Sequence, residues 1–168
     1  MLLGSNQAVQ NRSSTAVQDF IEQLIGRSQY AEAYALLIQE PADQTVTQYN
    51  LALCFYTAGY FNEALMCLDK AQAYLPVNQN NKNAINNGFY KALLDNQNQL
   101  NNHFFAITDK HLQLLPQKVT DGIIRLKTDC WMQLGNYAKI LETATPIAYK
   151  QYRNVTEALA VAKKHLNQ

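Results

Sequence analysis

The stretch that decides the fold is TVTQYNLALCFYTAGYFNEALMCLDKAQAYLP, residues 45–76. Its first half places Leu51, Ala52 and Phe55 at the three- and four-residue spacing of one face of an α-helix. Gly59 follows, and glycine readily adopts the left-handed backbone conformation that ends a helix. The first half therefore predicts a helix that closes in a tight turn.

The second half of this stretch predicts another helix packed against the first. Phe61, Ala64 and Leu68 recur at helical spacing. Pro76 ends the pattern, because its ring and missing N–H cannot continue a helix. The small side chain of Ala64 lets two helices approach closely, while larger neighbours fill the space around the contact. Residues 45–76 are thus expected to form one antiparallel helical hairpin.

This combination of residues resembles a tetratricopeptide repeat (TPR). The family pattern has a large residue, Leu with Gly or Ala, an aromatic residue, Gly shortly before another aromatic residue, Ala, and finally Ala and Pro. It is matched by Leu51, Ala52, Phe55, Gly59, Phe61, Ala64, Leu68, Ala71 and Pro76, whereas Gln48 stands where the family often has Trp. The resemblance implies an all-α, right-handed superhelix in which hairpins stack and their first helices line a concave groove.

Weaker copies of the hairpin lie on both sides of this repeat. SQYAEAYALL at 28–37 is similar to its second helix, and LGNYAKIL at 134–141 is similar to its turn. Their spacing scatters around the TPR period of roughly 34 residues. We expect a flexible N-terminus at 1–12 and a repeat domain at 13–168, with about four hairpins near 14–41, 45–76, 85–116 and 121–150 and a capping helix at 153–167.

Composition narrows the functional classes. The chain has 14 basic and 13 acidic side chains, a net charge of +1, and no basic run. Nucleic acid is therefore not an expected partner. No stretch approaches the roughly 20 apolar residues that a membrane span requires, so we expect no membrane insertion.

The sequence offers no constellation for catalysis or metal binding. Cys54, Cys67 and Cys130 are an odd, widely spaced set without a CxxC pair, and the three histidines share no metal-ligand spacing with them. We expect these cysteines to be buried thiols in a cytoplasmic protein. Phosphate-binding loops, nucleophile elbows and zinc-protease motifs are absent from the sequence. We therefore expect no enzyme activity, no metal and no cofactor.

The first helix of the best repeat carries a second apolar stripe, Tyr49, Leu53 and Tyr56. One interpretation is the centre of a peptide-binding groove, since tyrosine combines a large apolar body with a polar tip. The alternative is that the stripe packs against neighbouring repeats. Equivalent positions in the other repeats extend the candidate site, which comprises Gln18, Glu22, Tyr49, Asn50, Leu53, Tyr56, Tyr90, Arg125, Asp129 and Met132.

The resemblance also bears on the ligand. Some TPR proteins grip the C-terminal carboxylate of a chaperone with a set of charged and amide side chains, and of the corresponding positions here only Asn50 fits. An apolar or extended segment is therefore the expected ligand. The predicted function is a protein-interaction module that binds a peptide or protein. Two alternatives remain: a dedicated chaperone for secreted proteins, and a structural subunit whose repeat face is buried in an oligomer or larger complex.

Overall fold

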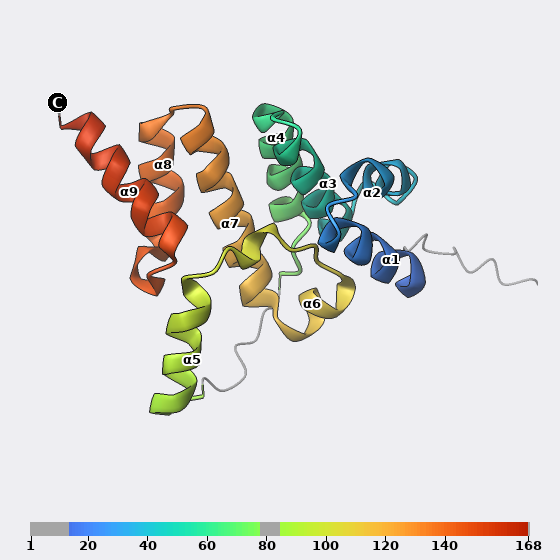
Figure 1. Ribbon diagram of the computed structural model, residues 1–168, viewed down its shortest axis with the longest axis horizontal. Helices are drawn as coiled ribbons and strands as arrows, with labels where there is room; N and C mark the ends of the chain where they lie inside the picture. Colours follow the sequence, from blue (N-terminus) through green and yellow to red (C-terminus); the bar gives the residue numbers. More distant parts are fainter. Residues whose placement is uncertain (1–13, 78–84, 168) are drawn as a thin grey trace, which may run out of the picture.

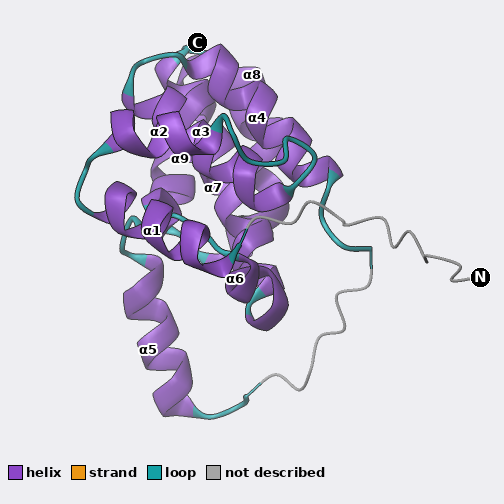
Figure 2. Ribbon diagram, turned by 90° about the vertical axis from the view of Figure 1, so that its right-hand side faces the viewer, coloured by secondary structure: helices purple, strands orange, loops and turns teal. Residues whose placement is uncertain are grey.

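The computed structural model describes residues 14–77 and 85–167. These residues form nine α-helices and two short 3-10 helices, without a β-strand (Figures 1 and 2). The prediction of an all-helical chain is confirmed for this part of the sequence. The flexible N-terminus expected at 1–12 lies outside the described residues.

Consecutive helices pair as hairpins and stack side by side (Figure 1). The residues expected to form the best repeat do form a closely packed pair of helices, joined by a short turn. Along the stack α2 packs on α3, α4 on α7, and α8 on α9. The hairpins are α1 (Thr15–Gly26) with α2 (Tyr30–Leu37), α3 (Thr45–Thr57) with α4 (Phe61–Ala73), and α7 (Pro116–Gln133) with α8 (Tyr137–Ala144), followed by η2 (Thr145–Lys150) and α9 (Arg153–Leu166).

These three hairpins turn through the same backbone conformation. Gly59 and Gly135 have φ angles of 82° and 65°, and Ser28 occupies the equivalent place between α1 and α2 with a φ of 60°. In each turn the next residue donates its N–H to a carbonyl five residues earlier, as Tyr60 does to Phe55 at 2.9 Å. This is the Schellman motif, which glycine adopts freely and which a side chain such as that of Ser28 makes strained.

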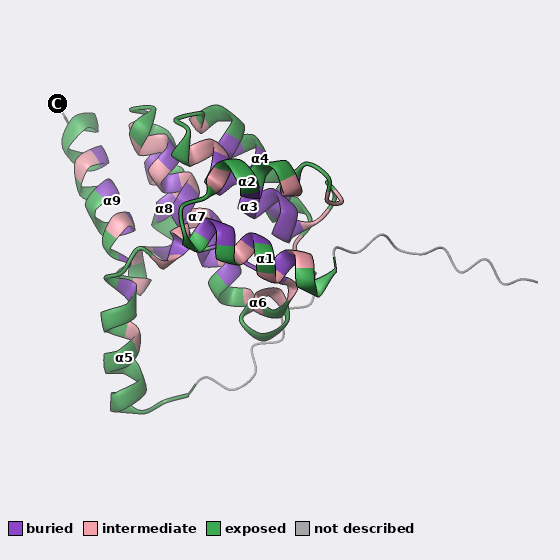
Figure 3. Cartoon of the chain, turned by 45° about the vertical axis from the view of Figure 1, so that its right-hand side comes forward, coloured by how far each residue is buried: buried purple, intermediate pink, exposed green. Residues whose placement is uncertain are grey.

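The core follows the helix-to-helix contacts. Ala52, Ala64, Leu68 and Ala71 have no exposed surface, so the small residues of the best repeat lie where helices meet, as predicted. Figure 3 shows α3, in the central hairpin, buried along most of its length. One apolar cluster contains residues of α1, α2, α3, α4 and α7. A second contains residues of α8, η2 and α9. Trp131 on α7 packs against both clusters and links them. The three cysteines are buried helix residues with free thiols.

Residues 85–116 depart from the expected third hairpin. They form α5 (Gly88–Asn98), η1 (Asn102–Phe104) and α6 (Asp109–Leu114), while α4 packs directly on α7. Figures 1 and 2 show α5 projecting from the body of the molecule, and among its residues only Asn98, at its end, is buried. The physical reason is that a short 3-10 helix and extended residues, rather than a second long helix, follow α5, so Phe89 and Leu93 remain exposed instead of closing a hairpin.

Candidate peptide-binding groove

The first helices of the three hairpins, α1, α3 and α7, direct side chains to one side of the stack. We call this surface the first-helix face, and its polar residues are Gln18, Tyr49, Asn50, Arg125 and Asp129. Residues 100–109, here called the crossover segment, run from the end of α5 to the start of α6 (Figure 1). Buried side chains from all three helices donate to this segment or accept hydrogen bonds from it. The crossover segment therefore lies where the sequence predicted a groove.

Two carboxamides hold the second half of the crossover segment. Asn50 on α3 donates to the carbonyl of Ile107 at 2.8 Å and accepts from the N–H of the same residue at 2.9 Å. Gln18 on α1 accepts from the N–H of Asp109 at 2.8 Å and donates to its carboxylate at 3.0 Å. Asn50 and Gln18 are 1% and 4% exposed, so both carboxamides satisfy polar groups that are shielded from water.

The first half of the segment is held by α3 and α7. The Tyr49 hydroxyl donates to the carbonyl of His103 at 2.6 Å, and Arg125 donates to the carbonyl of Leu100 at 2.8 Å. The His103 imidazole meets the Asp129 carboxylate at 2.6 Å between Nε2 and Oδ2. Asn154 of α9 ties the two α7 residues together, bonding Arg125 at 2.8 Å and Asp129 at 2.9 Å.

Burial sets the protonation states in this network. It lowers the pKa of His103 below its ordinary value, although Asp129 opposes the shift. The imidazole is therefore neutral near pH 7 and donates its Nε2 proton to Asp129. Its Nδ1 is buried without a hydrogen-bond partner among the described residues. Burial also raises the pKa of Tyr49, and it raises that of Tyr56 to about 12, so both phenols keep their protons.

The structure separates the ten candidate residues into two groups. Six of them contact the crossover segment: Gln18, Tyr49, Asn50, Tyr56, Arg125 and Asp129. The expectation of an open surface at this place is corrected by that segment, which comes from farther along the same chain and covers the stripe. It was missed because residues 85–116 were expected to form a hairpin.

Tyr56 is half-buried, with its ring centroid 5.1 Å from that of Phe104 in the crossover segment and 5.3 Å from that of Phe61. The remaining four candidates lie elsewhere. Leu53 is a core residue with 1% exposure. Glu22 is half-buried on α1, and Met132 packs against the second apolar cluster. Tyr90 is exposed on α5, where it lines a cavity.

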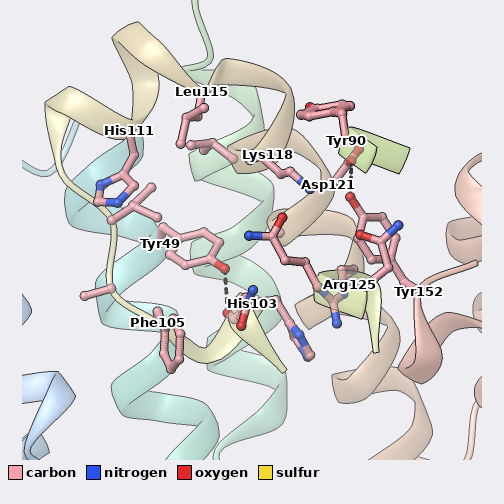
Figure 4. Close-up of a pocket in the computed structure, with 17 residues that line it drawn as sticks. Tyr49, Tyr90, His103, Phe105, His111, Leu115, Lys118, Asp121, Arg125 and Tyr152 are labelled. Atoms are coloured by element: carbon pink, nitrogen blue, oxygen red, sulfur yellow. Dashed lines mark hydrogen bonds between the residues drawn. The ribbon is translucent and has the colours of Figure 1, made fainter. Parts of the chain in front are cut away.

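That cavity is an open hollow beside the crossover segment. It has a volume of about 430 Å³ and lies between the crossover segment, α5 and α7 (Figure 4). A groove of about 690 Å³ adjoins it, bounded by α5, the corner between α6 and α7, and η2. The two volumes share six lining residues and form one cleft: Tyr90, Asn98, Leu115, Lys118, Asp121 and Tyr152.

Charges inside the cleft are largely paired. The Asp121 carboxylate accepts from the Tyr152 hydroxyl at 2.6 Å (Figure 4) and from Lys150 at 2.8 Å. The Arg125 guanidinium lies over the Tyr152 ring, 4.4 Å from its centroid. Lys118, by contrast, is an exposed cation at the junction of cavity and groove, with its pKa lowered by partial burial. The cleft is thus apolar along its walls and basic at its centre.

Ile107, Asp121 and Tyr152 were not among the predicted site residues, because their partners are distant in the chain. Asn50 and Ile107 are 57 residues apart, and Asp121 and Tyr152 are 31 apart. One local signal was present: the glycine at position 122 inside a helix. A Cβ there would lie 2.9 Å from the Tyr49 hydroxyl oxygen, so Gly122 makes room for the ring that holds the crossover segment.

No family model, curated protein or solved structure shows significant similarity to this chain. Within residues 14–77 and 85–167, no helix is long and apolar enough to cross a membrane. The same residues contain no cluster of three or more His, Cys, Asp or Glu side chains that could hold a metal ion.

Proposed function

We propose that this chain is a protein-interaction module of the TPR type, which acts in the cytoplasm and binds a segment of a partner protein. The proposal is supported by three hairpins that share one turn geometry and direct their first helices toward one face. In a TPR superhelix that face is the concave one. The free thiols of the three cysteines fit a cytoplasmic setting.

The observation that carries the proposal is the open cleft between α5 and α7. Its cavity, about 430 Å³, has the size of a pocket for a large side chain or a short peptide stretch. Its walls include Tyr90, Leu115 and Val119, and Lys118 stands at its centre. The fitting partner is therefore a segment with a large apolar side chain and a nearby carboxylate, because a buried anchor gives affinity and a complementary charge gives specificity.

Cross-linking tests whether a partner reaches this cleft. A photoreactive phenylalanine analogue is placed at Tyr90 in the cleft, and at Tyr60 as a matched control. Tyr60 is also an exposed tyrosine, but it lies in the turn between α3 and α4. We expect irradiation in the native cells to give a discrete adduct from position 90 alone. Equal adducts from both positions, or none from position 90, would contradict the proposal.

Charge reversal tests the chemistry of the partner. We expect Lys118→Glu to weaken binding of the cross-linked partner by more than about 1 kcal/mol, as loss of a central interface contact does. The matched control is Lys163→Glu, which reverses an exposed lysine on α9, away from the cleft. Equal affinity for Lys118→Glu and the unaltered protein, measured by titration calorimetry, would remove the acidic group from the proposed partner.

A permanent assembly subunit is the second candidate, and α5 favours it. Phe89 and Leu93 lie four residues apart on this helix and are 77% and 48% exposed. Exposed apolar surface of this kind is typical of an interface. If the chain assembles with itself, light scattering will give a multiple of 19.0 kDa, and Phe89→Ser with Leu93→Ser will return it to the monomer mass. A monomeric unaltered protein would leave the interaction module as the better explanation.

A further inference from the structure

We propose that the crossover segment is a ligand bound in cis, and that an extended segment of another protein binds the same place on the first-helix face once the crossover segment leaves it. This inference rests on the proposed function, because it assigns a second, covered binding surface to the interaction module. This surface adjoins the cleft, since five residues of the crossover segment line the cavity, but the test of the cleft does not involve Asn50 or Gln18.

The first reason is that most of the hydrogen bonds between the first-helix face and the segment are to the main chain of the segment, the exceptions being those to the Asp109 carboxylate and the His103 imidazole. Asn50 pairs with both the N–H and the carbonyl of Ile107, as a neighbouring strand would. Gln18 accepts from the N–H of Asp109, two residues further along. Residues two apart in an extended chain direct their groups to the same side. The backbone between them is extended, with φ −127° and ψ 172° at Thr108.

The second reason is the orientation of the segment's side chains. Leu100 and Phe105, two of its large apolar residues, are 54% and 66% exposed. The residues that face inward are His103, which contacts Asp129, and the small or branched Ala106, Ile107 and Thr108, while Phe104 packs partly against the core. A core segment normally buries its largest apolar residues. The first-helix face therefore accepts an extended backbone with a small residue followed by a β-branched one at positions 106–108, and an imidazole at position 103.

The third reason is that the segment can leave without dismantling the stack. The helix before it, α5, buries only Asn98, and the helix after it, α6, has no buried residue. Contact between α4 and α7 joins the two halves of the stack directly. The burial lost on opening is therefore confined to the segment's own inward residues, His103 and 106–108, and opening is expected to be local rather than global.

Because the crossover segment is tethered, it competes strongly with any outside ligand. A short tether gives an effective concentration in the millimolar range, so a free peptide of equal affinity binds weakly to the unaltered protein. Loosening the tethered copy removes this competition. A change in the segment should therefore create binding, whereas a change in the face that receives it should abolish binding. A purely structural segment would not give this opposite behaviour.

Hydrogen exchange on the unaltered protein gives the first test. The amides of Ile107 and Asp109 are bonded to side chains of the first-helix face. We expect them to exchange together, and at least about 10-fold faster than the central amides of α3 and α7, because they open locally. Exchange of these two amides at the rate of the α3 core would show that the segment leaves only on global unfolding, and the proposal would be overturned.

Peptide titration gives the second test. The probe is a fluorescent synthetic peptide with the sequence of residues 100–111, LNNHFFAITDKH. We expect the full chain carrying Ile107→Ala to bind this peptide at least about 10-fold more tightly than the unaltered protein does, because its own segment is weakened. Adding Asn50→Ala to this variant should remove the gain.

The matched control is Ile140→Ala, which truncates a fully buried isoleucine in the second apolar cluster, outside the crossover segment. A gain with Ile140→Ala equal to that with Ile107→Ala would indicate general loosening and overturn the proposal, as would no gain in a folded Ile107→Ala protein. If Ile107→Ala does not fold by circular dichroism, hydrogen exchange on the unaltered protein decides alone. A cross-linked adduct from position 90, together with no binding of the peptide to the folded Ile107→Ala protein, would overturn the proposal that the crossover segment is a ligand in cis. The same result would still support the interaction module.

Discussion

The effect of Gly122→Ala on stability should depend on Tyr49: we expect it to be destabilising when Tyr49 is present and stabilising in a Tyr49→Phe protein. A Cβ at position 122 would lie 2.9 Å from the Tyr49 hydroxyl oxygen but 3.5 Å from the nearest ring carbons. The hydroxyl cannot move away easily, because it donates to the His103 carbonyl at 2.6 Å and the ring is 1% exposed. The steric clash of an added Cβ is therefore with the Tyr49 hydroxyl oxygen alone.

The magnitudes follow from two opposing effects. Alanine stabilises a helix interior by about 1 kcal/mol relative to glycine, while overpacking a rigid core costs about 1–3 kcal/mol. Gly122→Ala should therefore destabilise the unaltered protein by up to about 2 kcal/mol. In a Tyr49→Phe background the oxygen is absent and the remaining contacts are ordinary, so the same substitution should stabilise by up to about 1 kcal/mol.

Urea unfolding of the four proteins measures this cycle, provided that the dependence of the free energy of unfolding on urea stays the same. Tyr49→Phe alone should cost about 1–3 kcal/mol, since it leaves the buried His103 carbonyl unpaired. The reasoning is refuted if Gly122→Ala stabilises the protein that keeps Tyr49, or if its effect is the same in both backgrounds.

Three further predictions concern stability. Ala64→Leu should lower the free energy of unfolding by about 1–3 kcal/mol, because Ala64 has no exposed surface where α3 and α4 meet; equal melting temperatures would show that this contact yields easily. Ser28→Gly should raise it by about 1 kcal/mol, because Ser28 holds a φ of 60°, and an unchanged urea midpoint would mean that the turn is unstrained. The lowered pKa of His103 means that the unfolded chain binds more protons as the pH falls below about 6.5, so stability should be lost there on acidification. His103→Gln should flatten the stability profile below about pH 6.5; an unchanged profile would exclude His103 as its source.

Residues 45–76 could be predicted well because their information is local. Helical spacing on both sides of Gly59, with Ala64 at the contact, indicates a hairpin without reference to the rest of the chain. The turn at Ser28 was harder to predict, because serine, unlike glycine, does not indicate a left-handed backbone conformation. Its equivalence to the glycine turns became visible only in the backbone of the folded chain.

The positions of the candidate residues on the first helices could be predicted, but the segment that covers them could not. Positions on the first helices that share a repeat register, such as Gln18, Asn50 and Arg125, do face one common strip of the molecule. The segment that fills this strip was not predictable, because residues 85–116 have no strong helical-hairpin pattern and their contacts are with residues more than 20 positions away. Hydrogen bonds of that range leave no periodic trace in a sequence.

The sequence by itself thus determined that the described chain is helical, where its best hairpin turns, and which small residues its helices need in order to touch. The tertiary structure alone decided that α4 packs directly on α7, that α5 stands apart, and that residues 100–109 cover the first-helix face. The physical reason lies in the range of the forces. Backbone propensity and side-chain periodicity act over a few residues and are written in the order of amino acids. The pairing of Asn50 with Ile107 depends on which buried polar groups find each other once the stack has formed.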